Sequence, residues 1–263
     1  MARSTGSETL RAGAWTIVAV AVLAASSALV RAEGLIAPGG GSATAQFDEG
    51  VYVGAAGALV EGDLPYRDHV FLHPPGIFVL LGPVAATVEP LSSWSGVLLV
   101  ARWLVVLVAA GNVVLVALNG VRWRGWLAGV VAGALYACYL PAVRTEGHVM
   151  LEPFVNFFVL AGALIWCGRA RRSGSDARAA WAGSLIGFGM TVKLTGGLAL
   201  IALLVSDRRR GPRRHRTTTL VAASVVVAAG SGLEERPART TPSATAASPP
   251  AAIGTTQEVL VDR

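Results

Sequence analysis

Long apolar segments, each followed by a short polar or arginine-rich stretch, alternate along most of the chain. Residues 12–30 are an uninterrupted apolar run, which at about 1.5 Å per residue just crosses a hydrocarbon core of roughly 30 Å. A cleaved signal peptide has a shorter apolar region, so we predict an uncleaved first span. Further apolar runs lie at residues 76–91, 94–118, 125–141, 151–167 and 180–206, with a weaker one at 217–230. The pattern predicts an all-α, polytopic transmembrane helix bundle.

The composition agrees with a membrane protein and excludes several other classes. Charged residues make up 14% of the chain and hydrophobic residues 53%, whereas a soluble domain carries about 25% charged residues. This hydrophobicity excludes a disordered chain over most of the length. The 2 cysteines, Cys138 and Cys167, lie in separate apolar runs. We therefore expect free thiols and no disulfide-stapled fold.

Clusters of arginine predict how the spans are oriented. They lie at residues 122–124, 169–178 and 208–216, and they contribute to a net charge of +6. Positive charge beside a span marks the cytoplasmic side, so we interpret the basic balance as topology and expect no nucleic-acid partner. Consecutive clusters are then separated by an even number of crossings. Residues 76–91, interrupted by Pro83, should therefore lie at the interface or re-enter, and residues 180–206 should go in and return as two short helices around Lys193.

The same topology divides the chain into three parts. Residues 1–11 are expected in the cytoplasm, and residues 12–232 form the transmembrane module in the plasma membrane. Residues 233–263 are rich in Pro, Thr, Ser and Ala without periodicity, so we expect them to be disordered.

Three polar segments face the extracytoplasmic side on this topology: the first loop at residues 31–75, the turn at 142–150, and Lys193. Within the loop, residues 48–61 place apolar side chains at helical spacing, which predicts an amphipathic helix on the membrane surface. Gly62-Asp63-Leu64-Pro65 should end that helix.

The adjacent acids Asp48 and Glu49 open this predicted juxtamembrane helix. One interpretation makes Asp48 its N-cap, with Phe47 and Tyr52 forming a hydrophobic staple. The other makes one carboxylate a general base at the membrane surface. Both can hold, because a cap uses only one carboxylate oxygen.

Three basic side chains are candidate ligands for a phosphate. His73 precedes Pro74-Pro75, where it either caps the next helix or binds the anion. Arg102 and Lys193 lie inside apolar runs, where a charge costs at least about 2.5–3.5 kcal/mol and therefore suggests a function. Their structural alternatives are snorkelling of Arg102 to the outer interface and a polar tip of a re-entrant turn for Lys193.

A further polar group follows in the turn before the run at residues 151–167. Glu146, His148 and Glu152 lie on the same face as Asp48 and Glu49 in the predicted topology. They form either a solvated loop or an acidic site for a divalent metal or an acceptor, since carboxylates suit hard cations.

The first loop resembles that of a known family. FDEGVYVGAAGALVEGDLPYRDHVFLHPPGIFVLLGP is similar to the first extracytoplasmic loop of GT-C glycosyltransferases related to the protein O-mannosyltransferases and the lipid A aminoarabinose transferase (glycosyltransferase family 39 and its kin). In that family an acidic pair opens a juxtamembrane helix, a G-x-x-P-Y turn follows, and a His or Lys precedes Pro-Pro. The matching positions here are Asp48-Glu49, the turn ending at Tyr66, and His73.

Later segments extend the resemblance over about residues 12–206. VARWLVVLVAAGN, with Arg102, resembles the second span of the family, which contains an arginine. VMLEPFVNFFVLAGAL resembles the segment whose leading acid lies near the site, here Glu152. GFGMTVKLTGGLAL resembles the segment that carries a lysine, here Lys193.

The resemblance implies a GT-C bundle and a membrane enzyme of the cell envelope, a mannosyltransferase-like hexosyl or pentosyl transferase. Its donor would be a sugar on a polyprenyl phosphate, and its acceptor a hydroxyl of a lipid, glycan or protein, glycosylated with inversion on the outer face. Asp48, with Glu49, would remove the acceptor proton, and His73, Arg102 and Lys193 would hold the donor phosphate. The cofactor stays open, with a divalent cation as one option.

Relatives carry several more spans and often a periplasmic domain, so we expect a C-terminally truncated member. Two rival interpretations follow. One is an inactive fragment of such an enzyme. The other is a transporter that uses Arg102 and Lys193 as substrate ligands, which predicts an internal repeat. The sequence shows no such repeat.

Overall fold

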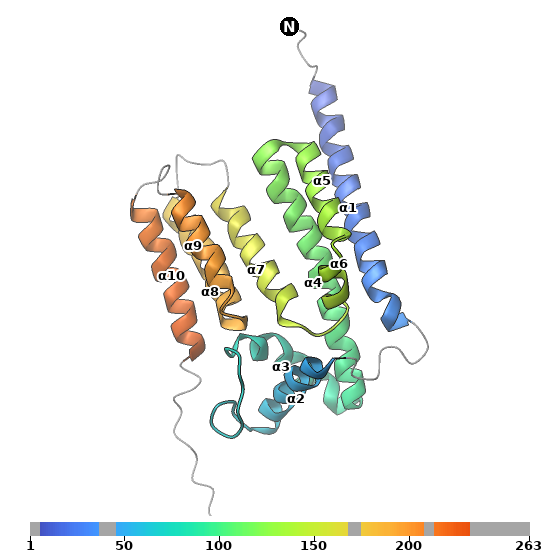
Figure 1. Ribbon diagram of the computed structural model, residues 1–263, viewed down its shortest axis with the longest axis vertical. Helices are drawn as coiled ribbons and strands as arrows, with labels where there is room; N and C mark the ends of the chain where they lie inside the picture. Colours follow the sequence, from blue (N-terminus) through green and yellow to red (C-terminus); the bar gives the residue numbers. More distant parts are fainter. Residues whose placement is uncertain (1–5, 37–45, 168–174, 208–212, 232–263) are drawn as a thin grey trace, which may run out of the picture.

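The computed structural model describes residues 6–36, 46–167, 175–207 and 213–231, and its regular elements are helices (Figure 1). They are α1 (Gly6–Ile36), α2 (Phe47–Glu61), α3 (Gly76–Val88), the 3-10 helix η1 (Glu89–Leu91), α4 (Trp94–Arg124), α5 (Trp126–Ala137), α6 (Leu140–Thr145), α7 (Leu151–Trp166), α8 (Ser175–Val192), α9 (Gly196–Asp207) and α10 (Arg213–Ser231). The all-α prediction is confirmed for these residues. The expected disordered tail at residues 233–263 lies outside them.

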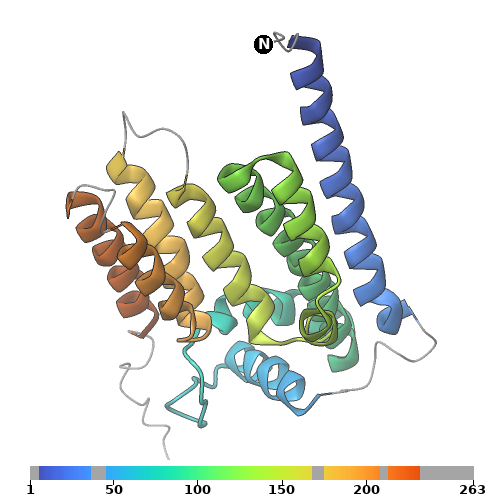
Figure 2. The same cartoon turned by 45° about the horizontal axis from the view of Figure 1, so that its top comes forward.

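The long helices run side by side, and α2 and α3 lie across one end of the bundle (Figures 1 and 2). That end, here called the α2–α3 end, also holds α6 and the turn between α8 and α9. The α4–α5 turn, the last residues of α7 and α9 and the first residues of α8 and α10 lie at the opposite end, together with the start of α1 (Figure 1). The two short helices predicted around Lys193 are confirmed as α8 and α9. The helix at residues 76–91 crosses the end of the bundle instead of running along it.

The bundle is held together where small residues let helices approach closely. α4 and α5 form an antiparallel hairpin whose turn is Gly125, with φ +90°, a conformation that other residues adopt at a cost. A Cβ on Gly129 would lie 2.7 Å from the Ala117 carbonyl oxygen, so the hairpin requires a glycine there. Such contacts are common between membrane helices.

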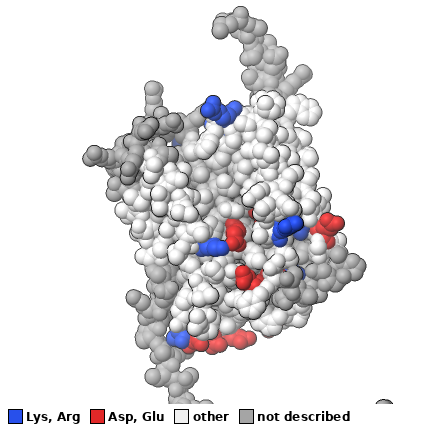
Figure 3. Space-filling view, viewed as in Figure 1, with Lys and Arg blue, Asp and Glu red and all other residues white. Residues whose placement is uncertain are grey.

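The outer surface of the long helices is apolar. Large exposed side chains come from several helices, among them Trp15 (71% exposed), Leu107 (67%), Trp181 (66%) and Leu198 (70%). In Figure 3 the upper part of the bundle is almost entirely white, and most charged side chains gather toward the α2–α3 end. Soluble monomers rarely expose apolar surface of this extent. Two helical segments, Gly13–Ile36 and Trp94–Arg124, are long and apolar enough to cross a membrane.

A hydrophobic core joins α2 and α3 to the long helices at this end. Ile77 and Leu81 of α3, Val105 of α4 and Phe154 of α7 are at most 2% exposed, and Tyr52 of α2 joins the same cluster. The apolar face predicted for residues 48–61 is therefore confirmed. This core fixes α2 and α3 on the bundle and so positions the polar groups described next.

Candidate functional site

The two adjacent acids at the start of α2 have opposite surroundings. Asp48 is exposed, whereas Glu49 is 0% exposed. The N-cap is Gln46, in an extended conformation, so Asp48 lies in the first turn of the helix, where its charge suits the helix dipole. The predicted cap and staple are therefore wrong: Phe47 is 85% exposed and does not pack on Tyr52.

Glu49 forms a buried ion pair with Arg102 of α4. The Arg102 Nε donates to Glu49 Oε1 at 2.8 Å, and Nη2 donates to Oε2 at 2.6 Å. The backbone N–H of Val149 donates to Oε1 at 2.8 Å, and His148 Nδ1 lies 3.5 Å from Oε2. Arg102 is 1% exposed. In contrast to the prediction of snorkelling or phosphate binding, its guanidinium is occupied by a carboxylate, because a buried charge is stable only when paired.

The partners of Glu49 determine its protonation. Burial raises the pKa of Glu49, but the hydrogen bonds from Arg102 and Val149 outweigh it, and the net pKa is lowered. The carboxylate is thus ionised and engaged on both oxygens. Such a group is a weak base, and the contacts of Glu49 tie α2 to α4 and to the segment before α7.

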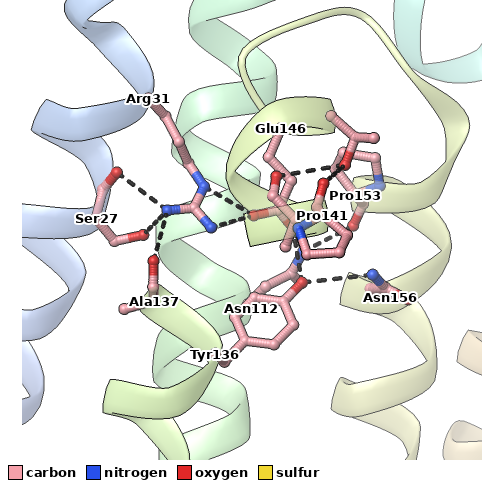
Figure 4. A network of polar contacts seen from close by, with 11 residues as sticks. Ser27, Arg31, Asn112, Tyr136, Ala137, Pro141, Glu146, Pro153 and Asn156 are labelled. Carbon is pink, nitrogen blue, oxygen red and sulfur yellow. Dashed lines mark hydrogen bonds and ion pairs between the residues drawn. The ribbon is translucent and has the colours of Figure 1, made fainter. Parts of the chain in front are cut away.

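Glu146 belongs to a second buried network, which connects α1, α4 and α5 (Figure 4). Its Oε2 accepts from Arg31 Nε at 2.8 Å, and its Oε1 accepts from the Tyr136 hydroxyl at 2.6 Å and from Asn112 Nδ2 at 3.4 Å. Asn112 also donates to the Pro153 carbonyl at 2.9 Å. Glu146 is 1% exposed. Glu146 therefore does not lie in a solvated loop, one of the two alternatives, and its carboxylate oxygens are occupied by groups of this chain.

Sequence reasoning missed the basic and polar members of this network. Asn112 is a polar residue in the middle of an apolar run, a signal that marks a candidate interhelical contact. Arg31 directly follows the first apolar run, a position where a flanking positive charge is ordinary. Within the described ranges, no group of three or more His, Cys, Asp or Glu side chains is placed to hold a metal.

Glu152 and Lys193 form an ion pair that solvent reaches. Lys193 Nζ lies 2.5 Å from Glu152 Oε1, and the side chains are 30% and 46% exposed. Glu152 lies in the first turn of α7, and Lys193 lies in the turn between α8 and α9. Two charges predicted from separate motifs thus meet at the α2–α3 end.

His73 lies within electrostatic range of Glu152. Its ring centroid is 5.8 Å from that of Tyr52. Its carbonyl oxygen accepts a hydrogen bond from the hydroxyl of Tyr66, which has φ +67°. A Cβ on Gly76 would lie 2.6 Å from the carbonyl oxygen of Thr191, so the start of α3 touches the end of α8 just before Lys193. His73, predicted as a helix cap or a phosphate ligand, makes no cap bond to α3.

Tyr52 lies beside His73 and within electrostatic range of Asp48 and Glu152. Burial, followed by the negative charges of Asp48 and Glu152, raises its pKa to about 12, so the phenol stays protonated. The half-buried His73 and the exposed Asp48 complete the arrangement. We call Asp48, Tyr52, His73, Glu152 and Lys193 the open cluster.

No protein-family model, no curated protein and no solved structure matches this chain. The chemistry of the open cluster is therefore deduced from its own residues. It offers two exposed carboxylates, a protonated phenol, an imidazole and an ammonium group. These groups come from elements of the α2–α3 end, toward which most of the charged side chains gather (Figure 3). A proton acceptor beside cations at the end of an apolar bundle suits transfer of a group from a lipid-borne anion to a polar molecule.

Proposed function

We propose that the chain is an integral membrane glycosyltransferase of GT-C type, which moves a sugar from a polyprenyl phosphate to an acceptor hydroxyl at the outer face of the plasma membrane. The observation that carries the proposal is the open cluster, in which Asp48, His73 and the Glu152–Lys193 pair meet at one end of an apolar bundle. The lipid tail of the donor would lie along the apolar surface, and its phosphate would reach the cations at this end.

Asp48 is the proposed general base. It is exposed, so its carboxylate is free to accept the proton of an acceptor hydroxyl as that oxygen attacks the anomeric carbon. The new bond joins the acceptor oxygen to the sugar, and the bond from the sugar to the phosphate oxygen breaks with its electron pair on phosphate. Attack opposite the leaving group inverts the anomeric centre.

Lys193 and His73 are the proposed ligands of the departing phosphate. Negative charge grows on the phosphate as the bond to the sugar breaks, and a nearby ammonium or imidazolium stabilises that charge most in the transition state. Arg102 is not assigned to this task, because its guanidinium already binds Glu49.

The buried pair of Glu49 and Arg102 has a positioning role in this proposal. It ties α2 to α4, and the bond from Val149 ties α2 to the segment that leads into α7. Asp48 on α2 and Glu152 on α7 are thereby held near each other. The base on α2 and the phosphate ligands beside α7 keep their spacing because the contacts of Glu49 hold these two helices together.

The test is turnover of a radiolabelled sugar on polyprenyl phosphate by the full chain in lipid nanodiscs, with a mixture of hydroxyl acceptors. The substitution Asp48→Asn should lower turnover by about 10²- to 10⁴-fold, the usual contribution of a general base. Glu61→Gln, which removes an exposed acid from the other end of α2, is the matched control and should retain turnover. Unchanged turnover in Asp48→Asn would refute the assigned base, and solute flux without sugar transfer would favour a transporter.

A further inference from the structure

The cation of the open cluster already has an anionic partner. Lys193 Nζ lies 2.5 Å from Glu152 Oε1, within ion-pair distance. Carboxylate and phosphate oxygens are alternative acceptors for the same ammonium group. A phosphate that binds Lys193 must therefore displace Glu152 from it.

Both partners stand on fixed backbone, so this exchange needs only side-chain movement. The backbone N–H of Lys193 donates to the Gly189 carbonyl at 3.0 Å, and the N–H of Gly196 donates to the Lys193 carbonyl at 3.1 Å. On the other side, Leu151, which precedes Glu152, is 1% exposed and anchors the start of α7. The ammonium can thus move away from Glu152 on its four-carbon stem without moving a helix.

We propose that Glu152 competes with phosphate for the Lys193 ammonium group. Glu152 pairs with Lys193 when no phosphate is bound, and it helps to expel the phosphate after the reaction. This inference rests on the proposed function and refines it. A sugar-bearing donor is a phosphodiester with one negative charge, whereas the product is a phosphate monoester with up to two. The product would hold Lys193 more strongly than the donor, and Glu152 counters that retention.

The exposure of the pair sets the size of the effect. A partly exposed pair of Lys and Glu is a weak interaction, so a phosphate can displace it. Removing the competing charge with Glu152→Gln should tighten binding of a phosphate monoester by about two- to five-fold. Lys193→Met should weaken binding, and Glu152→Gln added to Lys193→Met should change nothing further, because the competition requires the ammonium.

The experiment measures binding of farnesyl phosphate to the full chain in nanodiscs, for the wild type, the two single variants and the double variant. Glu61→Gln serves as the control for the loss of one surface acid at the same end of the bundle. A second series uses inorganic phosphate. Competition seen with farnesyl phosphate alone assigns the site to a lipid-borne phosphate, and equal competition with both assigns it to phosphate in general.

The outcomes separate this inference from the function on which it rests. Tighter binding in Glu152→Gln but not in Glu61→Gln, lost in the Lys193→Met background, supports the competitor. Unchanged or weaker binding in Glu152→Gln, with weaker binding in Lys193→Met, overturns the competitor but leaves the phosphate site intact. If farnesyl phosphate binds none of the proteins, both the competitor and the proposed donor site are refuted. Glu152→Asp, which retains the charge, should bind like the wild type or only slightly tighter.

Discussion

The α2–α3 end of the bundle contains two kinds of ion pair, and they differ in their access to water. The Glu49–Arg102 and Glu146–Arg31 pairs are at most 1% exposed, and each carboxylate accepts hydrogen bonds from further groups. The Glu152–Lys193 pair is open, with side chains 46% and 30% exposed. The buried pairs join helices, whereas the open pair can exchange partners.

The contrast is sharpest between two consecutive residues. Asp48 and Glu49 are neighbours in α2, and successive side chains on a helix point about 100° apart. Glu49 therefore faces α4 and its arginine, while Asp48 faces solvent. Sequence neighbours of the same chemical type thus divide into an anchor and a candidate base, and burial distinguishes them.

The largest expected effect comes from breaking a buried pair. Arg102→Met removes the guanidinium that balances the charge of the buried Glu49 carboxylate and should lower the free energy of unfolding by about 3–5 kcal/mol. Replacing both partners, with Arg102→Met and Glu49→Leu, should recover much of that loss, since an apolar pair avoids the desolvation penalty. Unfolding in mixed micelles with increasing denaturing detergent measures both variants.

Arg124→Met is the control for this comparison, because it removes an exposed arginine from the last turn of the same helix. Its effect should be near zero. Equal losses in Arg102→Met and Arg124→Met would mean that the Glu49–Arg102 pair does not anchor α2.

A smaller loss is expected where α3 meets α8, next to the open pair. Gly76→Ala places a Cβ 2.6 Å from the Thr191 carbonyl oxygen, so one helix must shift, at a cost of about 1–3 kcal/mol. Gly54→Ala, in α2 with open space around the new methyl group, is the matched control and should be neutral or slightly stabilising. The same unfolding assay applies. Equal stability of the two alanine variants would show that α3 and α8 do not pack closely.

The next largest effect is expected from acid, which should weaken the Glu49–Arg102 pair by protonating Glu49. The pKa of Glu49 is lowered from its ordinary value of 4.5 in the folded chain. Its contribution to stability is therefore complete above that value and is lost as the pH falls through the lower, folded-state pKa. Comparing the unfolding midpoint at neutral and acidic pH should show a steeper loss in the wild type than in Glu49→Gln. Glu61→Gln should follow the wild type, and an identical acid slope in all three proteins would contradict this linkage.

The smallest effect concerns Tyr52, which borders the open cluster. Its pKa of about 12 is raised by burial and then by the charges of Asp48 and Glu152. Asp48→Asn should shift that pKa downward, because it removes one negative charge near the phenol. Ultraviolet titration of phenolate formation, with Tyr52→Phe to identify the signal among the 4 tyrosines, measures the shift. An unchanged titration in Asp48→Asn would place Asp48 too far from Tyr52 to share one site.

The fold was largely predictable because its signals are local. Apolar runs and arginine clusters predicted the helices and the break around Lys193, and Gly62, with φ +102°, ends α2 as expected. Of the candidate site, the placement of Glu152 and Lys193 at one end was predicted, whereas their ion pair was not.

The assignment of partners was not predictable, because it depends on tertiary packing. Which of two adjacent acids faces Arg102 is set by the rotation of α2 on its core, and no short pattern encodes that rotation. Likewise, Glu146 turns toward Arg31, a residue far away in the sequence. A polar residue such as Asn112 inside an apolar run reveals that a contact exists, but not which partner makes it.

The unequal lengths of the helices have a consequence for the surrounding lipid. α5 and α9 have 12 residues each and extend only about 18 Å, whereas α4 has 31 residues and extends about 46 Å. In the proposed membrane setting, lipid must compress beside the short helices or the chain must tilt, at a small cost per ångström of mismatch. Acyl-chain length should therefore change the depth at which the Glu152–Lys193 pair meets the headgroups. Bilayer thickness would then regulate how readily a lipid headgroup reaches this end of the molecule.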